Sequence, residues 1–226
     1  VRAELGQTFL LYAEVEAAEN TRNFAEQFAI ASLAGTSLNP VSTYDGSFFG
    51  CRLYEFQAIE ASSAQTSAQP HSICHILIVL NDSQPDFSSL ANQGYDSLLS
   101  LLCCRHKIRY IQAQARESNR SARTLYAKID DRLKQFSSAI AIPDVSTQLD
   151  RLQTLLAQIP IDAQSYTQHL SDLHAHCTAI DVNIANYEIS LKQLAAIGET
   201  PPFWQQFLTL SRDRDRTQIQ TNIDYL

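Results

Sequence analysis

The sequence of 226 residues has only six glycines and no methionine. The glycines form no glycine-rich turn, which excludes phosphate-binding loops of the P-loop and dinucleotide-binding types. The longest apolar run, from Ile73 to Leu80 with His75 inside it, is far shorter than the roughly 20 residues of a membrane-spanning helix. We therefore expect no such helix here. Because the sequence lacks methionine and begins at Val1, we expect it to be a piece of a longer protein.

The five cysteines are odd in number and lack the spacing of a disulfide framework. With no cationic and apolar leader before them, they favour a reducing compartment and a cytoplasmic location. Cys103 and His106 are three residues apart on an expected helix and could supply half of a zinc site. No second pair has matching spacing, so the sequence favours buried thiols at these positions.

The charge is uneven along the chain. The net charge of −7 argues against a dedicated nucleic-acid-binding protein. Residues 101–142 nevertheless hold nine Lys and Arg against three Asp and Glu, whereas residues 143–200 hold two against seven. A basic row of this kind can bind nucleic acid or an anionic membrane, but aromatic residues are sparse among the basic ones, which favours a solvated face. The opposite charges of the two segments favour an antiparallel helical hairpin.

The first part of the chain combines strand and helix signals. We expect strands over Thr8–Glu16, Phe48–Ile59 and Ser72–Leu80, and a helix from Asn20 or Thr21 to Leu33 with Phe24, Phe28 and Ile30 as its apolar residues. Turn dipeptides predict a loop over Gly35–Gly46, and the Ser- and Ala-rich segment Ala61–Gln69 predicts a mobile connection. These signals predict a small mixed sheet of about three strands with helices, in an N-terminal α/β domain of residues 1–94.

From about Phe87 onward the spacing is helical. The first long helix is expected from Ser88 or Gly94 to about Ile140, and a second from Asp144 or Ser146 to a break at Pro160. A third helix is expected to start at Pro201–Pro202 and to continue through Leu226. These helices would form a long-helix region of residues 95–226.

Two heptad patterns support this interpretation. On the first helix, an apolar stripe comprises Leu101, Ile108, Ala115, Ala122, Ile129 and Phe136. Its companion row is polar at Arg105, Gln112 and Asn119 and apolar at Tyr126, Leu133 and Ile140. The clearest signal follows Pro160, where apolar residues alternate steps of four and three and predict a helix-packing seam: Tyr166, Leu170, Leu173, Cys177, Ile180, Ile184, Tyr187, Leu191 and Leu194.

The segment from Tyr166 to Leu194, YTQHLSDLHAHCTAIDVNIANYEISLKQL, resembles the last cytosolic helix pair of CorA-type divalent-metal-ion transporters. The shared features are His and Asp between heptad apolar residues and the Asn186-Tyr187-Glu188 end. The order of elements also agrees, because the family has a small α/β domain, two long helices of opposite direction and a third helix that continues into the membrane. The family's Gly-Met-Asn signature has no counterpart here, so the resemblance implies a piece that is truncated before the transmembrane helices.

The resemblance also implies regulation by Mg²⁺, which acidic side chains between neighbouring subunits bind in the family. No family ligand can be matched residue by residue. The local candidate is the face of His169, Asp172 and His176, which is able to converge on a transition metal. The alternative is a hydrated polar flank of a coiled coil. No nucleophile motif or converging acid pair supports an enzyme.

The sequence thus predicts an α+β protein with a small mixed sheet, a long antiparallel helical hairpin and a third, stalk-like helix. The favoured function is a cytosolic regulatory and oligomerisation domain of a CorA-like membrane protein that responds to Mg²⁺ or another divalent cation. We expect a homo-oligomer, attached to the membrane through an absent C-terminal segment, that is no enzyme and binds no nucleic acid. The alternative is a soluble coiled-coil scaffold that recruits a partner helix without metal or transport.

Overall fold

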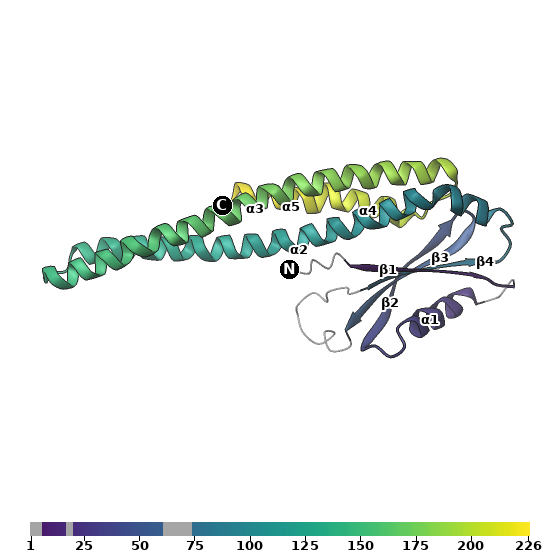
Figure 1. Cartoon of the computed structure of the whole chain (residues 1–226), viewed down its shortest axis with the longest axis horizontal. Coiled ribbons are helices and arrows are strands. Elements are labelled where there is room, and N and C mark those ends of the chain that lie inside the picture. Colours follow the sequence, from purple (N-terminus) through teal and green to yellow (C-terminus); the bar gives the residue numbers. More distant parts are fainter. Residues whose placement is uncertain (1–5, 17–19, 61–73) are drawn as a thin grey trace. The chain divides into compact units, whose positions relative to one another are not determined.

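A computed structural model describes residues 6–16, 20–60 and 74–226, and it shows an α+β fold with a mixed sheet followed by long helices (Figure 1). The predicted fold class is confirmed, with four strands instead of about three. The expected connection over Ala61–Gln69 lies outside the described residues. The elements are β1 (Gln7–Glu14), α1 (Thr21–Ser32), β2 (Leu38–Phe48), β3 (Cys51–Glu60), β4 (Cys74–Asn81), α2 (Phe87–Ile140), α3 (Val145–Ile197), α4 (Pro202–Leu210), the π-helical turn η2 (Ser211–Arg216) and α5 (Thr217–Asp224).

The sheet has the order β1-β4-β3-β2, with β1 parallel to β4 and the other pairs antiparallel. β4 is central, and Cys74 to Leu80 are all buried. A continuous apolar run is typical of a strand that is covered on both faces, which is why the sequence revealed this strand clearly. Asn81, at the end of the strand, holds the following turn by accepting the backbone N–H of Gln84 at 2.8 Å.

The prediction of a loop over Gly35–Gly46 is wrong, because Leu38–Phe48 forms the edge strand β2. An edge strand tolerates Pro40, which lacks a backbone N–H, and a register shift between Ser42 and Tyr44 accommodates an irregularity in the ladder. The hairpin turn is instead Phe49-Gly50, where both residues have positive φ, of 51° and 80°. Two such residues are typical of a tight turn between antiparallel strands.

α1 covers one face of the sheet (Figure 1). Asn20 caps the helix by accepting the backbone N–H of Asn23 at 3.1 Å. Ala25 and Ala29 are fully buried against Phe56 and Ile76, and their small side chains allow the helix to approach the sheet closely. The apolar residues that the sequence suggested for this helix, Phe24, Phe28 and Ile30, are exposed instead.

The chain divides into two compact units, each built from two separate stretches of the sequence, and the boundary at residue 94 stays a prediction. Unit 1 comprises residues 1–107 and 183–210, and unit 2 comprises residues 108–182 and 211–226. The division falls within α2 and α3. The start of α2 and the end of α3 belong to the unit that contains the sheet, whereas the remainder of both helices belongs to unit 2.

The predicted break at Pro160 is wrong, because α3 continues through this residue. Pro160 is exposed, and so is Leu156, whose carbonyl group loses its helical partner to the proline. Next to it, Arg132 of α2 donates to the Gln158 carbonyl at 3.1 Å and forms an ion pair with Asp162. These contacts from the neighbouring helix stabilise α3 on both sides of the proline. None of the helices in the described part of the chain is long and apolar enough to cross a membrane.

Candidate functional site

The predicted cation face lies on α3, in unit 2. The Nδ1 atom of His169 lies 3.9 Å from a carboxylate oxygen of Asp172, and both side chains are about one-third exposed. The other carboxylate oxygen of Asp172 accepts from Gln168 at 2.9 Å. Burial lowers the pKa of His176, although the nearby Asp172 opposes the shift. His176 is therefore favoured as a neutral imidazole with a lone pair available for a cation.

No group of three or more His, Cys, Asp and Glu side chains is arranged to hold a metal ion among the residues that the structure describes. The one-turn spacing brings His169 beside Asp172, whereas His176 follows a further turn along the helix. The assignment of a divalent cation to these three residues stays a prediction.

The nine seam residues all lie on α3. The seven from Leu173 to Leu194 are buried: Leu173, Cys177, Ile180, Ile184, Tyr187, Leu191 and Leu194. Tyr166 and Leu170, at the start of the series, are half-buried. In unit 1, the buried Tyr187 also donates through its hydroxyl to the Trp204 carbonyl at 3.3 Å.

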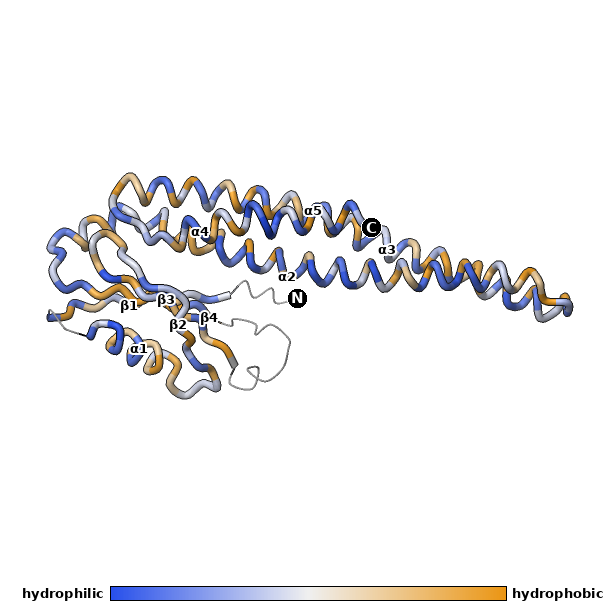
Figure 2. The backbone as a smooth tube through the Cα atoms, turned by 180° about the vertical axis from the view of Figure 1, so that it is seen from behind, coloured by the Kyte–Doolittle hydropathy of each residue, from blue (hydrophilic) through white to orange (hydrophobic). Residues whose placement is uncertain are grey.

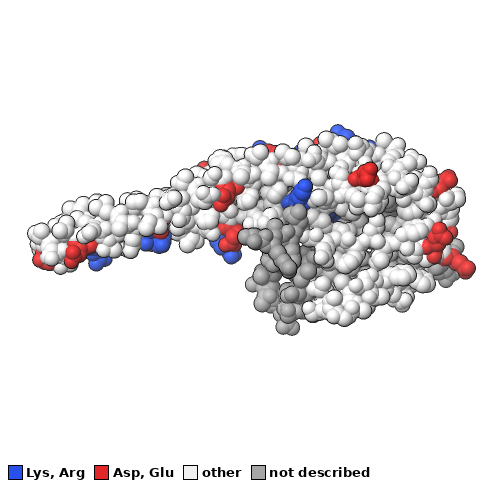
Figure 3. Space-filling view, in the orientation of Figure 1, with Lys and Arg blue, Asp and Glu red and all other residues white. Residues whose placement is uncertain are grey.

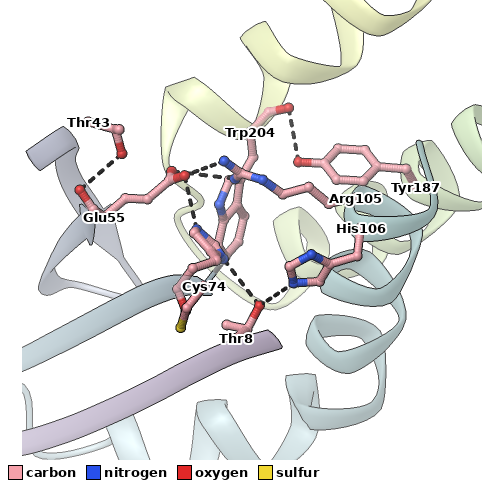
Figure 4. Close-up of polar contacts among 9 residues, drawn as sticks. Thr8, Thr43, Glu55, Cys74, Arg105, His106, Tyr187 and Trp204 are labelled. Carbon is pink, nitrogen blue, oxygen red and sulfur yellow. Dashed lines mark hydrogen bonds and ion pairs between the residues drawn. The ribbon is translucent and has the colours of Figure 1, made fainter. Parts of the chain in front are cut away.

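A cluster of buried charged groups in unit 1 is the main site that sequence reasoning missed (Figure 4). Glu55 of β3 is fully buried, and His75 of β4 and Arg105 of α2 are almost fully buried. The Arg105 guanidinium contacts both carboxylate oxygens of Glu55, and the Nε2 atom of His75 lies 2.9 Å from one of them. The guanidinium also lies 5.1 Å from the centre of the Phe207 ring of α4. The cluster joins two strands and two helices.

The environment keeps Glu55 ionised. Burial alone raises the pKa of its carboxyl, but the hydrogen bond from His75 and the positive charge of Arg105 outweigh that effect and lower the pKa. The backbone of Glu55 is held as well, because the Thr43 hydroxyl donates to its carbonyl at 3.0 Å.

Thr8 of β1 extends the cluster to a second histidine. Its hydroxyl oxygen lies 3.2 Å from Nδ1 of His75 and 2.6 Å from Nε2 of His106. A neutral His75 that donates to Glu55 accepts at Nδ1 from the Thr8 hydroxyl, whose oxygen in turn accepts from His106. Gly6 makes room for this contact, because a Cβ atom there would lie 2.7 Å from Nδ1 of His106. His106 therefore contacts β1, and the half zinc site suggested with Cys103 is not what positions it.

Carboxylate, imidazole and hydroxyl follow one another here in the order of a catalytic triad, in which the imidazole activates the hydroxyl as a nucleophile. Here, however, Arg105 neutralises Glu55, which weakens the support that the carboxylate could give to an imidazolium on His75. Thr8 is also bracketed by two imidazoles, so its hydroxyl is engaged on both sides. The arrangement is best suited to hold α2 on the sheet, with a chain of hydrogen bonds from Glu55 to the half-buried His106.

The basic row of α2 does not form one surface. Arg105 is buried in the cluster, while Lys128 and Arg132 both form ion pairs with the buried Asp162 of α3. Lys134 is paired with Asp130 on its own helix. On the face that Figure 3 shows, basic and acidic side chains are interspersed along the long helices. The two ion pairs with Asp162 are those expected of a helix that faces an acidic neighbour.

Comparisons with models of protein families, with curated proteins and with solved structures gave no match for this chain.

Proposed function

We propose that this chain is the cytosolic assembly and regulatory module of a CorA-like membrane protein, and that it acts without catalysis. The observation that carries the proposal is the order of the elements: a mixed sheet, two long helices of 54 and 53 residues with opposite directions, and a third helical segment that comprises α4, η2 and α5. This order is the one that the resemblance of Tyr166 to Leu194 implies. The long helices supply surfaces for association between copies of the chain.

The proposed regulatory ligand is Mg²⁺ or another divalent cation at the face of His169, Asp172 and His176. A hard cation prefers the carboxylate oxygens of Asp172 together with water, and a transition metal would also use the neutral imidazoles. A single carboxylate binds Mg²⁺ weakly, so the proposal requires further oxygen ligands from a neighbouring copy. Cation binding and association are then coupled.

The test compares the melting temperature and the light-scattering mass of the protein in chelator and in millimolar Mg²⁺. The expected result is that Mg²⁺ raises the melting temperature of the parent and of Asp150→Ala, a control that removes one exposed carboxylate from the same helix. The double variant Asp172→Ala/His176→Ala should fold normally and lose the response. A response that survives the double change would show that this face does not bind the cation.

The second candidate function is a coiled-coil scaffold that needs no metal. It is favoured by a specific observation, namely that several large apolar side chains near the loop between α2 and α3 are exposed. Self-association that is indifferent to chelator and Mg²⁺ would favour the scaffold over the cation-regulated module.

A further inference from the structure

One face of the helical hairpin in unit 2 is covered by α5 along part of its length. The covered part is marked by three contacts to the third helical segment. Gln112 donates to Asp215, Cys177 lies 3.7 Å from the Gln220 side-chain oxygen, and the Tyr166 hydroxyl donates to the Leu226 carbonyl. Along α3 the residue numbers fall from Cys177 to Tyr166, whereas those of their partners rise from Gln220 to Leu226. α5 therefore runs antiparallel to α3. In the described part of the chain, these contacts extend along α3 as far as Tyr166.

Beyond that level, no helix in the described part of the chain covers the same face. On α2, every seventh residue from Gln112 lies on this face, and the series changes from polar to apolar where the cover ends. On α3, the series that contains Cys177 likewise continues back toward the loop with apolar residues. We call the uncovered part the hairpin face and define it by Tyr126, Leu133 and Ile140 of α2 and Leu149 and Leu156 of α3.

All five side chains of the hairpin face are between 52% and 64% exposed. The contact between the two helices uses other positions, with Ala139 and Leu155 buried and Arg132 paired with Asp162. Ile140 directly follows Ala139, and Leu156 directly follows Leu155. In an antiparallel pair of helices, residues that directly follow contact positions lie on one common side of the pair. The hairpin face is thus one continuous apolar surface, and hydrophobic positions recur along both helices up to the loop in Figure 2.

We infer that the hairpin face is the docking site for the hairpin face of a second copy of this chain. The surface continues the one that α5 covers, so it suits a helix with an apolar side. Two hairpins placed face to face with opposite directions supply this helix to each other and close a four-helix bundle with twofold symmetry.

The size and charge of the hairpin face fit this occupant. The exposed parts of its five side chains sum to on the order of 600 Å² per copy, near the roughly 800 Å² per partner of a stable specific interface. Heptad positions on its outer side hold the uncharged Ser137, Ser146 and Gln153 and also Asp130, whose charge Lys134 balances. Like charges therefore do not oppose the approach of two copies.

This inference rests on the self-association proposed above, and it identifies the surface through which two copies of the chain associate. The test is sedimentation velocity of the whole chain from micromolar to hundreds of micromolar concentration, with and without chelator. We expect a dimer whose dissociation constant rises at least tenfold in Leu133→Asp and, independently, in Leu149→Asp. Both positions are more than half exposed in one copy, so circular dichroism should show unchanged helical content in either variant.

The matched control is Val182→Asp, which changes a residue of α3 that is 54% exposed and lies outside the hairpin face. It should dimerise like the parent. The inference is overturned by a parent that stays monomeric at the highest concentration, by dimers that persist in both Leu variants, or by an equal loss in the control. The effect of Mg²⁺ on the melting temperature of the parent and of Asp172→Ala/His176→Ala is measured separately. A failure of the cation proposal can therefore be distinguished from a failure of this contact.

Discussion

Replacing Arg105 by Met tests whether the buried charge cluster holds α2 on the sheet. Met keeps much of the length of the side chain and removes its charge. Glu55 then remains fully buried, with His75 at 2.9 Å as its remaining hydrogen-bond donor. Removing one partner of a buried pair costs about 3–5 kcal/mol, and the lost contact with Phe207 adds about 1 kcal/mol. Uptake of a proton by Glu55 limits the loss, so we expect a total of about 4 kcal/mol.

A loss of about 4 kcal/mol should lower the melting temperature by about 10 °C in a chain of this size. Urea unfolding can be followed through the fluorescence of Trp204, which is the single tryptophan and is fully buried in the same unit as the cluster. The matched control is Arg120→Met on the same helix, where the side chain is 81% exposed and the expected change is within about 0.5 kcal/mol.

The double variant Glu55→Gln/Arg105→Met should be more stable than Arg105→Met alone, because it leaves no unpaired carboxylate inside the protein. The reasoning is refuted if Arg105→Met unfolds within about 1 kcal/mol of the parent, or if the double variant loses more stability than the single one. Either result would mean that the cluster does not depend on its charge balance.

Two further predictions concern stability. Leu173→Asp should lower the free energy of unfolding by more than about 4 kcal/mol, because it buries an unpaired charge at a fully buried seam position. Circular dichroism should show that this variant loses helix at a lower temperature than Val182→Asp. Equal melting temperatures of the two variants would contradict the packing of this seam. Because the pKa of Glu55 is lowered in the folded protein, its contribution is fully present above the usual Glu pKa of about 4.3 and is lost as the pH falls through the lower folded-state pKa. Urea titrations of Trp204 fluorescence should show this acid-induced loss in the parent and a smaller one in Glu55→Gln.

The fold was predictable wherever one pattern dominated. The apolar run of β4 and the alternation of β3 identified central strands, and the heptads identified α2 and the second half of α3. β2 was missed because its Pro and Gly residues are turn formers in isolation, and only pairing with β3 makes them part of an edge strand. On α1, hydrophobicity pointed to Phe24 and Phe28, whereas close packing on the sheet selected the small Ala25 and Ala29.

The buried charge cluster left a weaker trace in the sequence. Glu55 follows Cys51 and Leu53 on one side of an alternating strand, and His75 interrupts an otherwise apolar run, so each is a polar residue at a position expected to be buried. These signals mark residues that need partners. They do not identify the partners, because Arg105 is 50 residues from Glu55 and resembles the other basic residues of its helix. The pairing of Glu55 with Arg105 depends on the order of the strands in the sheet and on which turn of α2 packs against the sheet.

The cluster also explains how a repetitive helix finds one register. The apolar stripe of α2 repeats every seven residues, so a shift by one heptad would still place apolar residues on the sheet. Such a shift would put Leu98 or Gln112 in the place of Arg105, and neither can balance the charge of Glu55. The unpaired carboxylate would then cost about 3–5 kcal/mol, which is comparable to a large part of the stability of a typical domain. A buried ion pair adds little net stability over an apolar pair, but here it excludes the shifted alternatives.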